Sequence, residues 1–157
     1  MWRKVACAAV LGSCLPLAAC AGPVPDDGAY RHAALQTSMA MVSDLASGQL
    51  AAQLGLRGSS FPAFTDGNVT DAENDAGSVD STFGSRQPPD ARSDALRQKM
   101  LQALSDGTSA LTDLRVAVRM DDRAQVRKAL AEVGKSALPS WPPRCRCWSG
   151  SASRSAT

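Results

Sequence analysis

The spacing of apolar residues is the feature that most constrains the fold of this chain. One polar-looking segment carries them at intervals of three and four positions, at Val69, Ala72, Ala76, Val79 and Phe83. That interval is the period of one face of an α-helix. Aromatic residues make up only 4% of the sequence, so the core must be aliphatic and rich in alanine. Such a core suits packed helices better than a sheet, and the sequence predicts an all-α fold.

Three other segments show the same period. We expect a helix over 29–56, with a stripe at Leu35, Met39, Val42, Leu45 and Ala52. Another begins at Pro89 or Asp90 and reaches Met120, with Gly107 as a candidate bend. Its stripe is Leu96, Met100, Ala103, Leu104, Leu111, Leu114 and Val118. The last helix is expected over 123–138, with Val126, Leu130, Val133 and Ala137 on one face. Asp122 and Gln125 have the spacing of a capping box at its start.

The acidic segment decides how many helices there are. Its composition is that of a loop, with Asp66-Gly67-Asn68 followed by further acids, whereas its apolar spacing predicts a helix over 68–83. The alternative is three helices joined by an acidic linker of about 30 residues, which is uncommon in a compact domain. We therefore predict an antiparallel up-down four-helix bundle over 29–138.

The N-terminus has the parts of an export signal. Arg3 and Lys4 precede an almost wholly apolar run, and small residues lead to Leu17-Ala18-Ala19-Cys20. This segment resembles the signal peptide and lipobox of bacterial lipoproteins. The resemblance implies export, a diacylglycerol on the Cys20 sulfur, and cleavage just before Cys20. Two acyl chains on one cysteine would hold the protein stably on a membrane.

Other interpretations of this segment remain open. Cys14 ends a second lipobox-like run, although it leaves a short apolar region after Lys4. Ordinary cleavage after Ala21 would release a free secreted protein. An uncleaved helix would have only residues 5–21, whereas a membrane span usually needs about 20 apolar residues.

The lipoprotein interpretation divides the chain into four parts. Residues 1–19 are the signal peptide, 20–28 a lipidated tether rich in proline, glycine and acids, 29–138 the bundle, and 139–157 a disordered tail. The predicted location is the extracytoplasmic face of the cell membrane. Without Arg3 and Lys4 the basic and acidic residues are equal in number, which argues against a nucleic-acid partner.

Charge is unevenly distributed along the chain. Residues 20–85 hold two basic residues against eight acidic ones, and residues 86–135 hold ten basic against seven acidic. We expect acidic and basic helices to pair within the fold; the alternative is an acidic surface for a cationic partner and a basic one for anionic headgroups. Arginines recur every four residues, at Arg115, Arg119, Arg123 and Arg127. The break at Asp121-Asp122 favours a turn between them over one continuous phosphate-binding stripe.

Residues that carry chemistry are sparse. His32 is the only histidine, and no His/Cys cluster surrounds it in the sequence, so we expect it to be solvated rather than a metal ligand. Cys145 and Cys147 lie close together in the tail and are expected to be exposed cysteines rather than a metal clip. The carboxylates Asp71, Glu73 and Asp75 lack the glycine and distant glutamate of a calcium loop. No Walker A or dinucleotide motif occurs. The sequence predicts no enzyme, cofactor or metal.

Beyond the lipobox, the passage from Phe83 to Pro88-Pro89 and the paired final helices loosely resemble small actinobacterial lipoproteins of unknown function. Only Cys20 receives a role from that resemblance. We expect an envelope lipoprotein whose bundle binds or scaffolds another envelope component. The alternative is a carrier of an apolar small molecule, for which small residues inside the bundle would leave room, at Ala72, Ala76 and Ala103.

Overall fold

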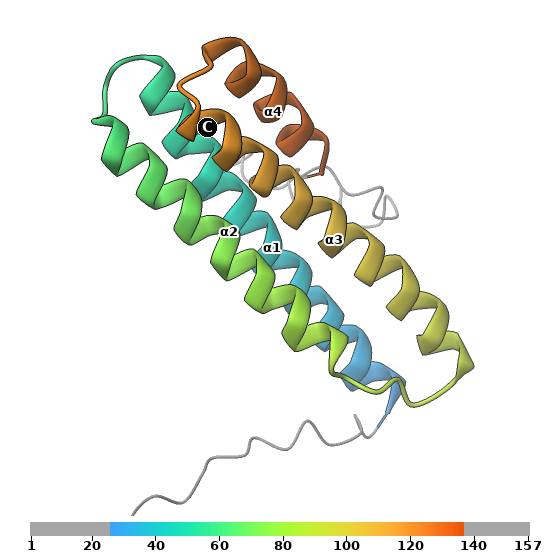
Figure 1. Ribbon diagram of the computed structural model, residues 1–157. Coiled ribbons are helices and arrows are strands. Elements are labelled where there is room, and N and C mark those ends of the chain that lie inside the picture. The colour runs from blue at the N-terminus through green and yellow to red at the C-terminus, as the bar shows by residue number, and fades with distance from the viewer. Residues whose placement is uncertain (1–25, 137–157) are drawn as a thin grey trace, which may run out of the picture.

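The protein forms a bundle of four helices. The computed structural model describes residues 26–136, in which the helices are α1 (Asp27–Leu56), α2 (Pro62–Gly84), α3 (Ala91–Arg119) and α4 (Arg123–Ser136). Successive helices run in opposite directions and are joined by short connections (Figure 1). Figure 1 places the start of α1 at the lower end and the α1–α2 connection at the upper end. The predicted all-α four-helix bundle is confirmed.

Aspartates define the starts of α1, α3 and α4. The Asp26 carboxylate accepts a hydrogen bond from the Ala29 amide at 2.7 Å, and Asp90 accepts one from the Ser93 amide at 2.8 Å. Asp122 accepts from the amides of Ala124 and Gln125, which confirms the first half of the predicted capping box. These bonds satisfy amides that have no partner inside a helix.

The acidic segment is a helix, so the three-helix alternative with an acidic linker is wrong. α2 also begins six positions earlier than the predicted Asn68, at Pro62. Proline suits this position because its fixed φ is helical and its missing N–H would have no helical partner. The polar residues Asp66 and Gly67 are helical because Thr65 and Val69 on either side are buried against the rest of the bundle.

The core runs the length of the bundle. Its largest fully buried side chains are Tyr30, Phe83, Leu45, Leu104, Leu111 and Leu114. Tyr30 of α1 and Phe83 of α2 pack with ring centroids 5.7 Å apart and fill the lower end. The predicted burial of Phe83 is thus confirmed. Burial of this kind, rather than helix propensity, stabilises a helix as polar as α2.

Small residues bring the long helices close together. A Cβ added to Gly48 of α1 would lie 2.7 Å from a methyl of Leu111 and 3.4 Å from the Cβ of Ala72. Gly107 of α3 likewise faces Met41 and Leu45. α3 is unbroken through Gly107, and the glycine allows close contact with α1.

The predicted core stripe of α1 is partly wrong. Leu45 and Ala52 are buried, whereas Leu35, Met39 and Val42 are exposed. The buried face combines three large residues, Tyr30, Met41 and Leu45, with four small ones, Ala34, Gly48, Ala51 and Ala52. α1 therefore has two apolar stripes, and the one that carries the small residues packs inward. Ala103 of α3, also predicted on a core stripe, is exposed.

α4 is half as long as α3, with 14 residues against 29. It packs on α3 and α1 along the upper half of the bundle and does not touch α2 (Figure 1). It is described as far as Ser136, and the predicted end at Leu138 lies outside the described residues. Val126 and Val133 are buried as predicted, with Leu130 partly buried.

Candidate functional site

The structure places only some of the residues singled out from the sequence. Cys20, Cys145 and Cys147 lie outside residues 26–136, as do the predicted signal peptide and tail. His32 is exposed on the second turn of α1. Over the described part of the chain, no three His, Cys, Asp or Glu side chains converge to hold a metal ion.

The four regularly spaced arginines straddle a turn. Arg115 and Arg119 belong to α3, and Arg123 opens α4 after the turn at Asp121-Asp122. Arg119 pairs with Asp66 of α2 at 2.8 Å, and Arg115 pairs with Glu73. The expectation that basic and acidic helices pair within the fold is confirmed for these two arginines.

Glu73 is the most enclosed acid of the α2–α3 contact. It accepts hydrogen bonds from Arg115 and from the Thr112 hydroxyl, the latter at 2.7 Å. Burial by itself would raise the pKa of Glu73. The bonds from Arg115 and Thr112, with the charges of Arg115 and Arg119, outweigh burial and hold this pKa below its usual value. The carboxylate thus stabilises the fold while it is ionised.

Glu73→Gln should lower the free energy of unfolding by about 1–2 kcal/mol at pH 7, because Arg115 loses a charged partner in a partly buried place. A carboxylate with a lowered pKa stabilises above its unfolded-state pKa, and this contribution disappears as the pH falls through the folded value. The difference from wild type should therefore shrink below about pH 4. Thermal unfolding across pH measures both effects. Asp71→Asn, at an exposed acid of the same helix, is the matched control and should be nearly neutral.

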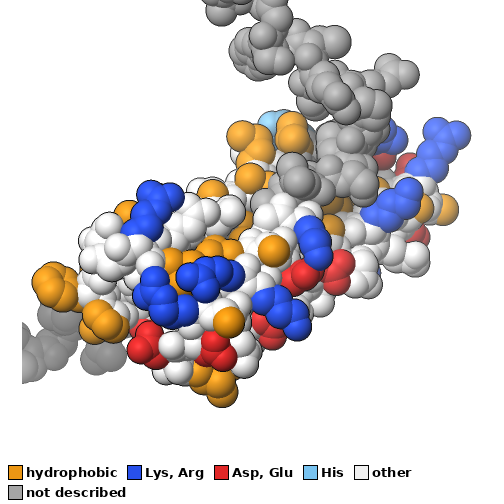
Figure 2. All heavy atoms as spheres, turned by 90° about the horizontal axis from the view of Figure 1, so that it is seen from above, with side chains coloured by type: hydrophobic (Ala, Val, Ile, Leu, Met, Phe, Trp, Pro, Cys, Tyr) orange, Lys and Arg blue, Asp and Glu red, His pale blue; other side chains and the backbone are white. Residues whose placement is uncertain are grey.

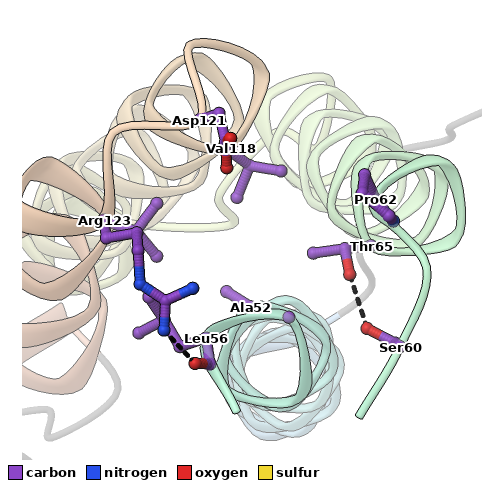
Figure 3. A pocket seen from close by; sticks show the side chains of 10 residues that line it. Ala52, Leu56, Ser60, Pro62, Thr65, Val118, Asp121 and Arg123 are labelled. Carbon is purple, nitrogen blue, oxygen red and sulfur yellow. Dashed lines mark hydrogen bonds between the residues drawn. The ribbon is translucent and has the colours of Figure 1, made fainter. Parts of the chain in front are cut away.

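A small open cavity of about 80 Å³ lies at the upper end of the bundle. It is lined by residues from all four helices and the α1–α2 connection, with Ala52, Thr65, Val118 and Arg123 among them (Figure 3). Arg123 donates to the Leu56 carbonyl across it, and the Ser60 and Thr65 hydroxyls share a hydrogen bond of 2.6 Å. Pockets for small molecules usually have volumes of about 300–1,000 Å³. This cavity is too small for a carrier site.

The outer face of α1 is a larger candidate. We use this name for the exposed stripe of Leu35, Met39, Val42, Ala46 and Leu50. These residues follow one another at intervals of 4, 3, 4 and 4, so they share one side of the helix. Met39 is 59% exposed and Leu50 57%. The stripe faces away from the core, and none of its side chains is buried by the described residues.

The outer face of α1 also lacks charge. Asp44 is the only charged residue between Arg31 and Arg57, and it is half-buried on the side toward α2. Its Oδ2 is buried without a hydrogen-bond partner among the described residues. Burial, and then the nearby charge of Asp75, raises the pKa of Asp44. A solvated helix normally carries charges on its outer side, whereas this one presents apolar residues flanked by glutamine and serine.

Charges of opposite sign lie on the two helices α2 and α4 that pack beside α1. Asp71 and Asp75 lie one turn apart on the exposed edge of α2, and Asp75 is close enough to Asp44 to influence its charge. Arg123 reaches Leu56 of α1 from α4, and Arg127 follows one turn later. Figure 2 shows Lys and Arg side chains next to Asp and Glu side chains on the face seen from above, with hydrophobic side chains exposed among them. Helical spacing places Asp44 on the opposite side of α1 from the outer face, so the acids of α2 do not border that face.

Sequence reasoning missed this face because it assigned Leu35, Met39 and Val42 to the core. The absence of exposed charge over residues 32–56 was the signal that could have found it. No helix within residues 26–136 carries an apolar stretch long enough to cross a lipid bilayer. Comparison of this chain with protein-family models, with curated protein sequences and with solved structures finds no match.

Proposed function

We propose that this protein is a cell-envelope lipoprotein, held on the extracytoplasmic face of the membrane through Cys20, whose bundle binds another envelope component through the outer face of α1. The observation that carries the binding role is that face, which is apolar and uncharged over about four turns of helix, from Leu35 to Leu50. An exposed surface of this kind is expensive to leave in water unless a partner covers it.

The anchor follows from the N-terminal sequence. A positive start, an apolar run and Leu17-Ala18-Ala19-Cys20 together favour lipidation at Cys20. α1 begins at Asp27, seven residues after Cys20. A chain of that length spans at most about 25 Å. Lipidation would keep the lower end of the bundle close to the bilayer, with the 30-residue α1 extending about 45 Å from that end.

The interior favours binding at the surface over transport of a ligand inside the bundle. Ala72 lies against Gly48, where small residues serve to bring α1 and α2 into contact. Ala76 is fully buried in the same core, while Ala103 is exposed. These alanines were the residues that could have left room for an apolar molecule, and none of them lines the cavity at the upper end.

Cys20→Ala should abolish incorporation of labelled fatty acid and leave the unprocessed precursor in the cell. The thiol of this residue is the proposed acceptor of the diacylglycerol, and cleavage is expected to follow lipidation. Cys14→Ala is the matched control and should label and mature normally. Metabolic labelling followed by membrane fractionation measures both. Lipid incorporation into the Cys20→Ala protein would show that the anchor is elsewhere.

A further inference from the structure

Two arginines lie at the C-terminal turn of α2, at the lower end of the bundle. Arg97, in the second turn of α3, donates from Nη2 to the Gly84 carbonyl at 2.8 Å. Arg86 follows α2, and its amide donates to the Phe83 carbonyl at 3.0 Å. Figure 1 shows this end of α2 next to the starts of α1 and α3. The backbone of one turn thus holds both arginines.

The side chain of Tyr30 reaches the same turn from α1, where its ring packs on that of Phe83. Burial raises the pKa of the Tyr30 hydroxyl. The charges of Arg97 and Arg86 act to lower this pKa, and the charge of Asp94 acts to raise it. The hydroxyl is therefore within electrostatic reach of both guanidinium groups.

Each of these three side chains has a buried polar atom without a hydrogen-bond partner among residues 26–136. The atoms are the hydroxyl oxygen of Tyr30 and the Nε atoms of Arg86 and Arg97, and Tyr30 is fully buried. In the described part of the chain, only Oδ2 of Asp44 is in the same state. Buried polar groups are nearly always paired, because an unmade bond costs the free energy of removing the group from water. Three unpaired groups at one place indicate a site for an acceptor.

The acids near this site do not supply that acceptor. No ion pair engages Arg86 or Arg97 over the ranges that the structure describes. Asp27 and Asp90 accept hydrogen bonds from other donors. Asp94 is exposed one turn before Arg97 and forms no hydrogen bond or ion pair with either arginine in the described structure.

We propose that Arg86, Arg97 and the Tyr30 hydroxyl bind a phosphate group. A guanidinium matches two phosphate oxygens with two N–H donors, and the phenol adds another donor. Both arginines are partly exposed, so an anion can reach them from the surface when their side chains turn toward it. A phospholipid headgroup and free inorganic phosphate offer the same chemistry.

The position of the site bears on the source of the phosphate. The site lies at the end of the bundle where α1 begins, at Asp27. Lipidation of Cys20 would hold this end within about 25 Å of the bilayer, the reach of seven residues. A headgroup source in the cell therefore rests on the anchor proposed above, whereas the binding of phosphate by these side chains does not. The site is also separate from the outer face of α1, because Tyr30 is on the buried side of that helix.

Tyr30 is the only tyrosine in the chain, so it gives a specific signal from the site. A ¹³C label on the ring carbon that bears the hydroxyl should give one NMR resonance. The full-length protein in a maltoside detergent, which carries no phosphate, is titrated with inorganic phosphate or with a short-chain phosphatidylglycerol. Sodium chloride of equal ionic strength and a diacylglycerol of the same chain length are the controls. A saturable shift with inorganic phosphate supports a site for phosphate itself, and one with the lipid alone supports a headgroup site. No saturable shift with either overturns the proposal.

Charge-removing variants test the assigned residues. Arg86→Gln and Arg97→Gln should each raise the dissociation constant about tenfold or more, the effect of losing one charged hydrogen bond. Arg92→Gln makes the same charge change at an exposed site on α3 and should alter it by no more than about twofold, as a screened distant charge does. Asp94→Asn should lower it, because a negative charge near the phosphate is removed. Circular dichroism checks that each variant is folded. Unchanged binding by folded Arg86→Gln and Arg97→Gln proteins would show that these arginines do not form the site.

Discussion

Replacing Phe83 by alanine should lower the free energy of unfolding by about 3–5 kcal/mol, the range observed for loss of a buried aromatic side chain. Phe83 is fully buried and packs on Tyr30 with ring centroids 5.7 Å apart. It comes from the last turn of α2, a helix in which Asp, Asn, Ser and Thr are frequent. The truncation removes the largest side chain that connects this helix to the lower end of the core.

Denaturant unfolding of the chain from Ala21 onward measures this change. Phe64→Ala is the matched control, since Phe64 belongs to the same helix but is 59% exposed, and its replacement should stay within about 0.5 kcal/mol. A similarly small effect of Phe83→Ala would contradict the packing of α2 and would restore the interpretation of a three-helix domain with an acidic linker.

Gly48→Leu should destabilise the bundle by about 3 kcal/mol, at the upper end of the usual cost of overfilling a core. Even a single added Cβ would lie 2.7 Å from a methyl of Leu111, which is itself fully buried, and 3.4 Å from Ala72. α1 must therefore move away from both α2 and α3 to admit a larger side chain. Thermal and denaturant unfolding should both report the loss.

Gly77→Ala is the control for the effect of glycine itself. No atom outside the local helix lies within 4 Å of a Cβ placed on Gly77. This substitution should stabilise α2 by about 0.5–1 kcal/mol, because alanine loses less conformational freedom in a helix than glycine does. If Gly48→Leu were as well tolerated as Gly77→Ala, the close approach of the three long helices at Gly48 would be wrong.

Helical spacing predicted the four helices even where composition suggested otherwise. The interval of three and four residues from Val69 to Phe83 identified α2 within a run of Asp, Ser, Thr and Gly. Aspartates located the starts of α3 and α4, at Asp90 and Asp122, for a local reason, since a capping carboxylate satisfies a backbone donor. The start of α2 was missed because Asp66 and Gly67 favour a loop in isolation, and only contacts with α1 make that turn helical.

The buried face of α1 could not be predicted from spacing, because two apolar stripes on this helix have the same period. Which one faces inward depends on the size of the partners' side chains. Gly48 and Ala52 permit closer contact than Leu35 or Met39 would, and Leu111 of α3 fills the space that Gly48 leaves. The choice is therefore made by residues far away in the sequence.

The sequence predicted that acidic and basic helices pair within the fold. It did not predict which acid pairs with which arginine. Glu73 meets Arg115 only because α2 and α3 pack in one particular register. The borders of the outer face of α1 depend in the same way on where α4 lies, and α4 contacts α1 only after the turn at Asp121-Asp122 reverses the chain. The sequence alone does not contain this packing of the helices, so it does not show which charged residues are neighbours.

Oxidation of two methionines distinguishes a covered from an open outer face of α1. Met39 on that face and Met120 at the end of α3 are almost equally exposed in the single chain, at 59% and 66%. In native membranes treated briefly with peroxide, mass spectrometry should find Met39 oxidised several-fold more slowly than Met120, because exposure controls this reaction. In the Leu50→Glu variant, whose charge disfavours the contact, the two rates should become similar. Equal rates in the unaltered protein in its membrane would show that nothing covers the outer face of α1.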